Sequence, residues 1–376
     1  MNKKIRVGLI YGGKSGEHEV SLSTAKAVVG EFDFGKYEVF PFYITKTGEW
    51  RAGAPLAGPV QDAAQLTFQD GASTGYAAML PLFGALSERK EVAVSGVSQP
   101  AADTAPLDVV FPLLHGTFGE DGTIQGMLEM LNMPYVGAGV LASSVGMDKV
   151  AMKKMFAQAE LPQCVYRFFT RKQWEKDRME YITEIEVSLG YPCFIKPANL
   201  GSSVGVSKAR NREELIEAVR EAFKFDRKVI VEEFVDAREI EVAVLGNDSP
   251  RASVPGEISS SGEFYDYKAK YVDGKSVMTI PAELPLETAQ EVQEMAIRAF
   301  KAIDGSGLAR VDFFLNRENG RLLVNEINTL PGFTPFSMYP LLWKQSGLPY
   351  RELLDELIDL AIERYREKQE IKYGIE

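Results

Sequence analysis

The stretch IKPANLGSSVGV, residues 195–206, decides how the rest of the chain is read. A short apolar run ends in Lys196, a loop rich in glycine, serine and asparagine follows, and the chain then returns as a strand. Gly201 and Gly205 allow the backbone to approach a ligand closely, and successive N–H groups in such a loop bind anions. The stretch therefore suits a polyphosphate, although its spacing is not that of a P-loop and an ordinary hairpin connection has the same composition.

Composition places the chain among ordinary globular proteins. Its 376 residues predict two or three domains, and 45% of them are hydrophobic and 25% charged. The net charge of −11 argues against nucleic-acid partners and against an anionic membrane surface. The two cysteines, Cys164 and Cys193, lie in apolar runs, which favours a reducing compartment and inert core thiols. Without a signal peptide or a long apolar span, we expect a cytoplasmic enzyme or binding protein.

The N-terminal third predicts an open parallel sheet. A buried strand at 5–11 and a helix at 21–32, with Ser21 as its expected cap, form an opening βα unit, and 37–44 and 107–114 are further strands. Segment 51–105, rich in Ala, Gly, Pro and Gln, predicts loops with one or two short strands.

Both histidines follow strands of this predicted sheet. His18 lies in EHEVS (17–21) and His115 opens HGTFGEDG (115–122). Open α/β sheets bind ligands at the carboxyl ends of their strands, so we favour a functional reading over solvated turns.

Three further segments carry candidate binding residues. Lys149 opens a helix against the preference of the helix dipole, which hints at function, although solvated first-turn lysines are common. The predicted strand 228–235 contains Glu232, and Glu239 follows it. The backbone donors and acceptors at the end of this strand suit an adenine edge, and Glu239 suits ribose hydroxyls; the alternative is that both acids are simply solvated. YDYKAKY, residues 265–271, suits a lid over a charged ligand or an exposed hairpin.

Two strands near the C-terminus, 308–314 and 321–328, predict a hairpin. A three-residue loop at 318–320 places Gly320 at its left-handed position and makes Arg317 pair with Arg321. In that register the facing pairs lie on one side of the sheet, and they are Asp312 with Glu326 and Arg310 with Asn328.

The converging oxygens of this hairpin predict a hard-cation site. Two carboxylates facing each other without a cation would repel, whereas Asp312, Glu326 and the Asn328 amide together suit Mg²⁺ and phosphate oxygens. The alternative is a polar sheet face. Beyond the hairpin, Ser337 is expected to cap a helix over 338–345, whose free N–H groups suit a carboxylate.

Seven motifs are distributed over nearly the whole chain: GGKSGEHEVS at 12–21, HGTFGEDG at 115–122, MDK at 147–149, KPANLGSSVGV at 196–206, YDYKAKY at 265–271, ARVDFF at 309–314 and NEINTLPGFTPFS at 325–337. In these motifs and their order the chain resembles the D-alanine–D-alanine ligases of the ATP-grasp superfamily. The resemblance implies an α/β protein that is α+β in its ATP-grasp part. An N-terminal open parallel α/β domain at 1–137 would be followed by two ATP-grasp lobes at 138–231 and 232–376.

The resemblance implies a reaction for peptidoglycan precursor synthesis. The carboxylate of one D-alanine attacks the γ-phosphate of ATP, and the amine of a second attacks the acylphosphate so formed. The implied catalytic residues are Glu17, Ser202, Tyr271 and Arg310, with Glu17, Ser202 and Tyr271 in one hydrogen-bonded network. The implied substrate-binding residues are Glu17, His115, Lys270, Arg310, Gly332, Ser337 and Met338.

Nucleotide and metal ligands are implied in the same way. Two Mg²⁺ or Mn²⁺ ions would bind Asp312, Glu326 and Asn328. ATP would contact Lys149, Phe194, Lys196, Ser202, Ser203, Glu232, Phe234, Val235, Glu239, Phe264, Lys270, Phe314, Asn325 and Glu326.

The resemblance further implies a homodimer formed through the N-terminal domain, although the long segment 51–105 departs from short family members and affects that surface. Ligases that make D-alanyl-D-lactate or D-alanyl-D-serine are the nearest alternatives. Lys270 and Tyr271 favour the dipeptide, because lactate-preferring relatives lose this pattern. Two further alternatives are another ATP-grasp ligase and a regulatory protein that binds nucleotide without turnover. Arg310 and the three predicted metal ligands argue against a regulatory protein, because binding alone needs no oxyanion donor.

Overall fold

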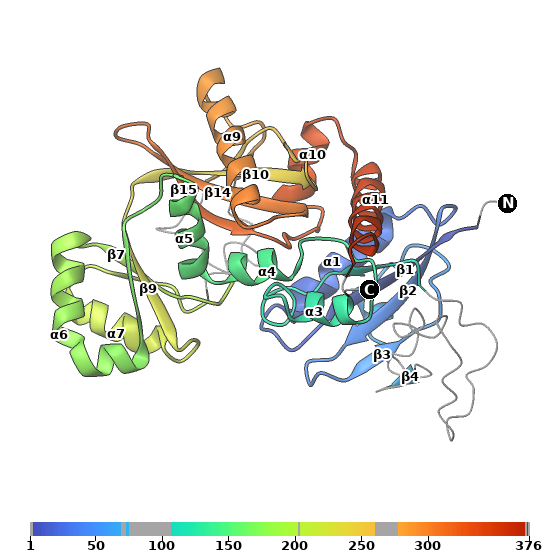
Figure 1. The fold of residues 1–376 in the computed structure, drawn as a ribbon, viewed down its shortest axis with the longest axis horizontal. Coiled ribbons are helices and arrows are strands. Elements are labelled where there is room, and N and C mark those ends of the chain that lie inside the picture. Colours follow the sequence, from blue (N-terminus) through green and yellow to red (C-terminus); the bar gives the residue numbers. More distant parts are fainter. Residues whose placement is uncertain are drawn as a thin grey trace.

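The structure is a computed structural model that describes residues 3–68, 73–74, 107–201, 204–259, 277–372 and 374. These residues form three β-sheets that follow one another along the chain. Figure 1 shows the N-terminal sheet at one end of the molecule and the sheet that contains β7 and β9 at the other, with the sheet of β10, β14 and β15 between and above them. No helix of the described residues is long and apolar enough to cross a membrane.

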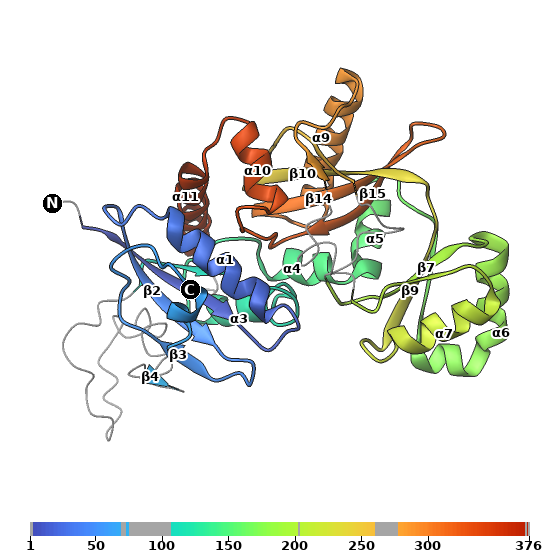
Figure 2. The ribbon, with the colours of Figure 1, turned by 180° about the vertical axis from the view of Figure 1, so that it is seen from behind.

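The N-terminal sheet has the order β4-β3-β2-β1-β5, and the predicted parallel arrangement of β1, β2 and β5 is confirmed. Strand β3 is added antiparallel to β2, and β4 antiparallel to β3, on one side of this sheet, where the sequence predicted one or two short strands. Helix α1 lies along this sheet (Figure 2). The elements are β1 (Ile5–Gly12), α1 (His18–Glu31), β2 (Tyr37–Ile44), β3 (Trp50–Ala52), η1 (Ala63–Leu66), β4 (Ser73–Thr74), β5 (Val109–Pro112) and α3 (Thr123–Met130).

Helix α1 begins at His18, so the prediction that it starts at Ser21 was wrong. Ser21 lies inside the helix, where its hydroxyl accepts the Gly12 N–H at 2.8 Å and donates to the Leu113 carbonyl at 2.5 Å. The hydroxyl thus joins the ends of β1 and β5 instead of capping a helix. This contact fixes the two loops that carry Glu17 and His115 relative to each other.

The second sheet, β6-β9-β7-β8, is antiparallel and is packed against α6 and α7. Strand β7 ends at Pro197 and β8 begins at Ser207, so the stretch that opened the sequence analysis connects two antiparallel strands. Both cysteines are buried and unpaired, as predicted. The elements are β6 (Tyr166–Thr170), α6 (Arg171–Ser188), β7 (Cys193–Pro197), β8 (Ser207–Ala209), α7 (Arg212–Ala222) and β9 (Lys228–Glu233).

The third sheet separates an apolar face from a polar one. Residues such as Val242, Val311 and Ile327 pack with helices α4, α5 and α9 in one core. The alternation of side chains along a strand turns their neighbours Glu241, Asp312 and Glu326 to the opposite face. The elements are α4 (Val140–Met147), α5 (Lys149–Gln158), β10 (Ala237–Gly246), β11 (Arg251–Ala252), β12 (Gly256–Ser259), β13 (Val277–Thr279), α9 (Leu286–Ala302), β14 (Gly307–Asn316) and β15 (Leu322–Asn328).

The C-terminal helices α10 (Met338–Gln345) and α11 (Tyr350–Gln369) return to the N-terminal sheet. Their apolar side chains share one core with β1, β2 and β5. The rings of Phe111 and Phe333 meet edge to face at 6.1 Å, and the Tyr37 hydroxyl donates to Asp355 at 2.5 Å. The last segment of the chain therefore holds the N-terminal sheet against the third sheet.

Candidate active site

Two adjoining cavities lie where the three sheets meet, and their walls share Lys149, Leu200, Gly201, Glu241 and Glu326. The first cavity is lined by every described residue that was predicted to bind the amino-acid substrates: Glu17, His115, Arg310, Gly332, Ser337 and Met338. The second is lined by every described residue predicted to contact ATP: Lys149, Phe194, Lys196, Glu232, Phe234, Val235, Glu239, Phe314, Asn325 and Glu326.

Five predicted site residues lie outside the described part of the chain. They are Ser202, Ser203, Phe264, Lys270 and Tyr271. Their roles, and the network expected to join Glu17, Ser202 and Tyr271, stay predictions.

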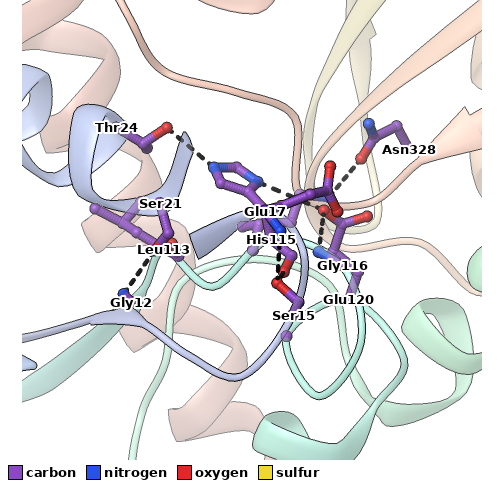
Figure 3. Close-up of polar contacts among 12 residues, drawn as sticks. Gly12, Ser15, Glu17, Ser21, Thr24, Leu113, His115, Gly116, Glu120 and Asn328 are labelled. Atoms are coloured by element: carbon purple, nitrogen blue, oxygen red, sulfur yellow. Dashed lines mark hydrogen bonds and ion pairs between the residues drawn. The ribbon is translucent and has the colours of Figure 1, made fainter. Parts of the chain in front are cut away.

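Glu17 and His115 come from neighbouring strands of the N-terminal sheet. Glu17 immediately precedes α1, His115 follows β5, and both side chains are buried. Figure 3 shows them converging with Glu120 and Asn328. The Ser15 hydroxyl donates to the His115 carbonyl at 2.6 Å and accepts the Glu17 N–H at 3.2 Å, which ties the two loops together.

His115 is held by partners on both ring nitrogens (Figure 3). Its Nε2 lies 3.0 Å from the Thr24 hydroxyl and its Nδ1 lies 3.5 Å from Glu120 Oε1. Burial alone would lower the pKa of the ring, but the Glu120 and Glu17 carboxylates and the Leu330 backbone outweigh it and raise that pKa. The first cavity thus carries an imidazole biased toward its charged form.

Two glycines let backbone approach these groups. Gly116 has φ of +73°, and a Cβ there would lie 2.4 Å from Glu17 Oε2. At Gly332 a Cβ would lie 2.8 Å from the Ser337 hydroxyl. Ser337 stands before α10 as predicted, but its hydroxyl does not cap the helix; it contacts the Thr334 N–H at 2.9 Å and the Thr334 hydroxyl at 2.8 Å.

The β14–β15 hairpin places its polar residues as predicted, but by a different route. Arg310 faces Asn328, and Asp312 faces Glu326. The predicted three-residue loop was wrong. Asn316 pairs with Arg321 and closes a four-residue loop, so next to the loop the pairing of β14 with β15 is shifted by one residue from the predicted register. A bulge then restores the predicted register, because two residues of β15, Asn325 and Glu326, lie opposite the single residue Asp312 of β14. The bulge explains why Asn325 and Glu326, adjacent in sequence, both line the second cavity.

Arg310 lies at the centre of a buried charge cluster. Its guanidinium makes two bonds of 2.7 Å to the Asp312 carboxylate and approaches Glu241 at 2.9 Å. Burial alone would lower the pKa of Arg310, but the carboxylates of Asp312 and Glu241 outweigh burial and raise that pKa well above its ordinary value. The arginine is therefore cationic. Glu241, on the adjacent strand β10, was not identified from the sequence.

The donor set at the hairpin suits a hard cation, with Asp312 and Glu326 on facing strands and the Asn328 amide beside them. The Asn328 Oδ1 accepts the Leu330 N–H at 3.2 Å, which orients the amide. Within the described residues no group of three or more histidine, cysteine or acidic side chains is arranged to hold a metal ion; the predicted set consists of two carboxylates and one amide.

The second cavity is lined by lysines and by aromatic rings. Lys149 begins α5 and donates to the Leu200 carbonyl at 2.8 Å, with Glu326 3.9 Å away. Lys196 donates to Glu232 at 2.7 Å. The Phe194 and Phe234 rings lie 6.2 Å apart, forming the apolar part of the wall.

Comparisons with known proteins agree with this arrangement. Residues 6–138 match the family described as D-ala D-ala ligase N-terminus, and residues 155–359 match D-ala D-ala ligase C-terminus. A D-alanine–D-alanine ligase of Bacillus licheniformis is 55% identical over 98% of this chain and 99% of its own length. One from Geobacillus thermodenitrificans is 55% identical over 99% of this chain and its entire length.

Solved structures show the same likeness. The D-alanine-D-alanine ligase of Coxiella burnetii superimposes with a TM-score of 0.77 at 34% identity, covering 98% of this chain and 96% of that one. The D-Ala:D-Ser ligase VanG of Enterococcus faecalis gives a TM-score of 0.79 at 34% identity, covering 96% of this chain and all of that one.

Proposed function

Because the chain belongs to the D-alanine–D-alanine ligase family, we propose that it joins two D-alanine molecules, consuming ATP and releasing ADP and phosphate, to supply D-alanyl-D-alanine for peptidoglycan synthesis. The observation that carries the proposal is the junction of the two cavities at Lys149 and Glu326. A nucleotide in the second cavity would direct its terminal phosphate toward an amino acid in the first.

The first D-alanine would place its ammonium against Glu17, with His115 lining its pocket. Its carboxylate would then attack the γ-phosphate. Arg310 and the Gly332 N–H would stabilise the oxyanion formed when the second amine attacks the acylphosphate. Ser337, the Met338 N–H and Lys270 would hold the second carboxylate, and α10 supports this role because its N-terminus borders the first cavity.

ATP would lie in the second cavity. Lys149 and Lys196 would hold phosphates, together with the loop residues Ser202 and Ser203. The base would lie against Phe234, Val235 and Glu232, with Phe194 in the same wall, and Glu239 would accept the ribose hydroxyls. Asn325 and Phe314 line the same wall, and Phe264 and Lys270 join them on the strength of the sequence alone.

Asp312, Glu326 and Asn328 would hold divalent cations, two Mg²⁺ or Mn²⁺ by the family pattern. Bound there, the ions would neutralise charge on the transferred phosphate. The carboxylate and amide oxygens fit such ions. Arg310 shares Asp312 with this site, and Glu241 provides the arginine with a second acidic partner.

The wider assignments rest on the resemblance. We propose domains at 1–137, 138–231 and 232–376, a homodimer formed through the N-terminal domain, and a cytoplasmic location without nucleic-acid or membrane partners. Helices α4 and α5, which this division assigns to the central lobe, share one hydrophobic core with the third sheet.

Substrate choice is tested by phosphate release from ATP. D-Alanine, L-alanine, D-lactate and D-serine are supplied singly and in pairs, and the products are identified by mass spectrometry. We expect release with D-alanine alone and D-alanyl-D-alanine as product. Preferential use of D-lactate or D-serine as the second substrate would instead make the protein a ligase that forms D-alanyl-D-lactate or D-alanyl-D-serine.

A further inference from the structure

Lys153 is a fully buried lysine outside the predicted site. It lies on α5 one turn after Lys149, and its side chain reaches residues of β6 and β9 in the second sheet. Its ammonium lies 3.3 Å from Glu232 Oε1 and 5.7 Å from the centre of the Tyr166 ring. Among the described residues Glu232 is its one acidic partner.

Glu232 lies between two lysines. Its Oε1 faces Lys153 and its Oε2 accepts from Lys196 at 2.7 Å. Glu232 and Lys196 line the second cavity, whereas Lys153 does not, so Lys153 supports the carboxylate from behind. Each carboxylate oxygen keeps a second acceptor site, which leaves Glu232 able to accept a hydrogen bond from a bound molecule.

The buried carboxylate depends on these cations for its charge. Burial by itself would raise the pKa of Glu232, but Lys153 and then Lys196 lower it to about 2. By the proposed function, Lys196 also binds a phosphate of ATP, so its positive charge is divided between that phosphate and Glu232. Lys153 does not line the cavity, so its ammonium faces Glu232 and not a bound nucleotide.

We propose that Lys153 is a positioning residue that makes the site select a 6-amino purine, by holding Glu232 as an oriented, ionised acceptor. The inference rests on the proposed use of ATP. An ionised carboxylate only accepts hydrogen bonds, so it pairs with an adenine amino group and repels the carbonyl of a 6-oxo purine. A carboxyl that is protonated, or turned away toward Lys196, loses this discrimination.

The test compares ATP with inosine triphosphate, which carries a 6-oxo group. In Lys153→Met the ratio of the two kcat/KM values should fall about tenfold, the worth of one charge-assisted hydrogen bond. The matched control is Lys154→Met, because Lys154 is the exposed neighbour on the same helix and should leave the ratio unchanged. A variant damaged only in packing would lose activity with both nucleotides equally, and an unchanged ratio in Lys153→Met overturns the proposal.

A double variant shows whether Lys153 acts through Glu232. Glu232→Gln should itself lower the ratio, and adding Lys153→Met to it should change the ratio no further. A full additional loss would overturn the proposal.

A conservative variant serves if Lys153→Met does not fold. Lys153→Arg keeps the positive charge, so the proposal requires that it retain the ratio of the two kcat/KM values, and a lowered ratio would overturn it. Calorimetric binding of both nucleotides without D-alanine separates this inference from the ligase assignment, because a failed assignment would abolish dipeptide formation but leave base selection measurable.

Discussion

At the scale of single residues, the site contains buried charged side chains, each of which contacts side chains of opposite charge. Arg310 contacts Asp312 and Glu241, and Glu232 contacts Lys153 and Lys196. Breaking such a group by removing one partner leaves an uncompensated charge, which is costly. These residues are therefore suited to hold fixed charges against a reacting phosphate.

Glu326 belongs to this network and, by our proposal, to the metal site. Glu326→Gln keeps the side-chain shape but removes an anionic oxygen, so we expect kcat to fall by at least about 10²-fold. Mn²⁺ binding measured by electron paramagnetic resonance should weaken in parallel, with the midpoint of thermal unfolding little changed. Glu318→Gln, at an exposed acid in the turn of the same hairpin, is the control. Near-wild-type turnover at limiting Mg²⁺ would refute the metal assignment.

The pKa of the His115 ring should depend on its acidic neighbour Glu120. Because Glu120 helps to raise the pKa of the ring, Glu120→Gln should lower it, and this is measurable from the His115 ring proton by NMR. The His18 signal serves as a reference in the same spectrum. A His115 pKa that stays where it was would show that Glu120 does not stabilise the charged ring.

The same shift affects stability. A folded pKa above the unfolded value of about 6.5 means that the charged ring stabilises the fold below that pH, and that this contribution disappears as the pH rises through the folded pKa. Chemical denaturation of the wild type should therefore show this loss as the pH is raised stepwise above about 6.5. Glu120→Gln should lose less across that interval.

At the scale of elements, the loop after β5 combines a turn with the wall of the first cavity. Gly116 has a left-handed conformation and touches Glu17, so Gly116→Ala should strain the backbone by about 1 kcal/mol and displace that carboxylate. We expect KM for D-alanine to rise by about tenfold or more. Gly126→Ala is the matched control, since Gly126 lies in α3 with open space around it and alanine should stabilise the helix there. Equal behaviour of the two variants would contradict the role given to Gly116.

Elements with a strong period were predictable, and their irregularities were not. The pairing of Asp312 with Glu326 followed from hairpin spacing, yet the loop length was wrong and the bulge at Asn325 corrected it. Neither feature has a clear signal in one sequence, because a bulge depends on contacts from neighbouring strands. The start of α1 was misplaced for a similar reason: Ser21 resembles a cap, but its hydroxyl is used between two strands.

Residues that support others were also missed, namely Thr24, Glu120, Lys153 and Glu241. Their partners are distant in sequence or known only once the strands are paired. A partial signal existed for two of them. Glu120 lies within HGTFGEDG, and Lys153 follows Lys149 at helical spacing.

At the scale of the whole molecule, α11 joins the N-terminal sheet to the third sheet. Arg364 donates to the carbonyls of Gly137 and, at 3.0 Å, of Tyr135, and its guanidinium also reaches the Ser306 hydroxyl at 2.6 Å. Its guanidinium lies 4.4 Å from the Tyr135 ring. One side chain thus connects the end of the N-terminal segment with the start of β14.

Removing that connection should destabilise the junction. Arg364→Met leaves several acceptors without a donor, at a cost of roughly 1–3 kcal/mol for each one that water does not reach. We expect the midpoint of thermal unfolding to fall by several degrees. The control is Arg366→Met, an exposed arginine on the same helix, which should have little effect. If both variants unfold alike, Arg364 does not hold the junction.

The central claim is that the first D-alanine is activated as an acylphosphate where the two cavities meet. It is tested most directly by supplying D-alanine labelled with ¹⁸O in both carboxylate oxygens and analysing the released phosphate by mass spectrometry. In the proposed reaction one carboxylate oxygen bonds to the γ-phosphorus, and that oxygen leaves with phosphate when the second amine forms the peptide bond. We therefore predict one ¹⁸O atom in phosphate for each D-alanyl-D-alanine formed. Dipeptide accompanied by unlabelled phosphate, or label transferred to AMP, would contradict the account.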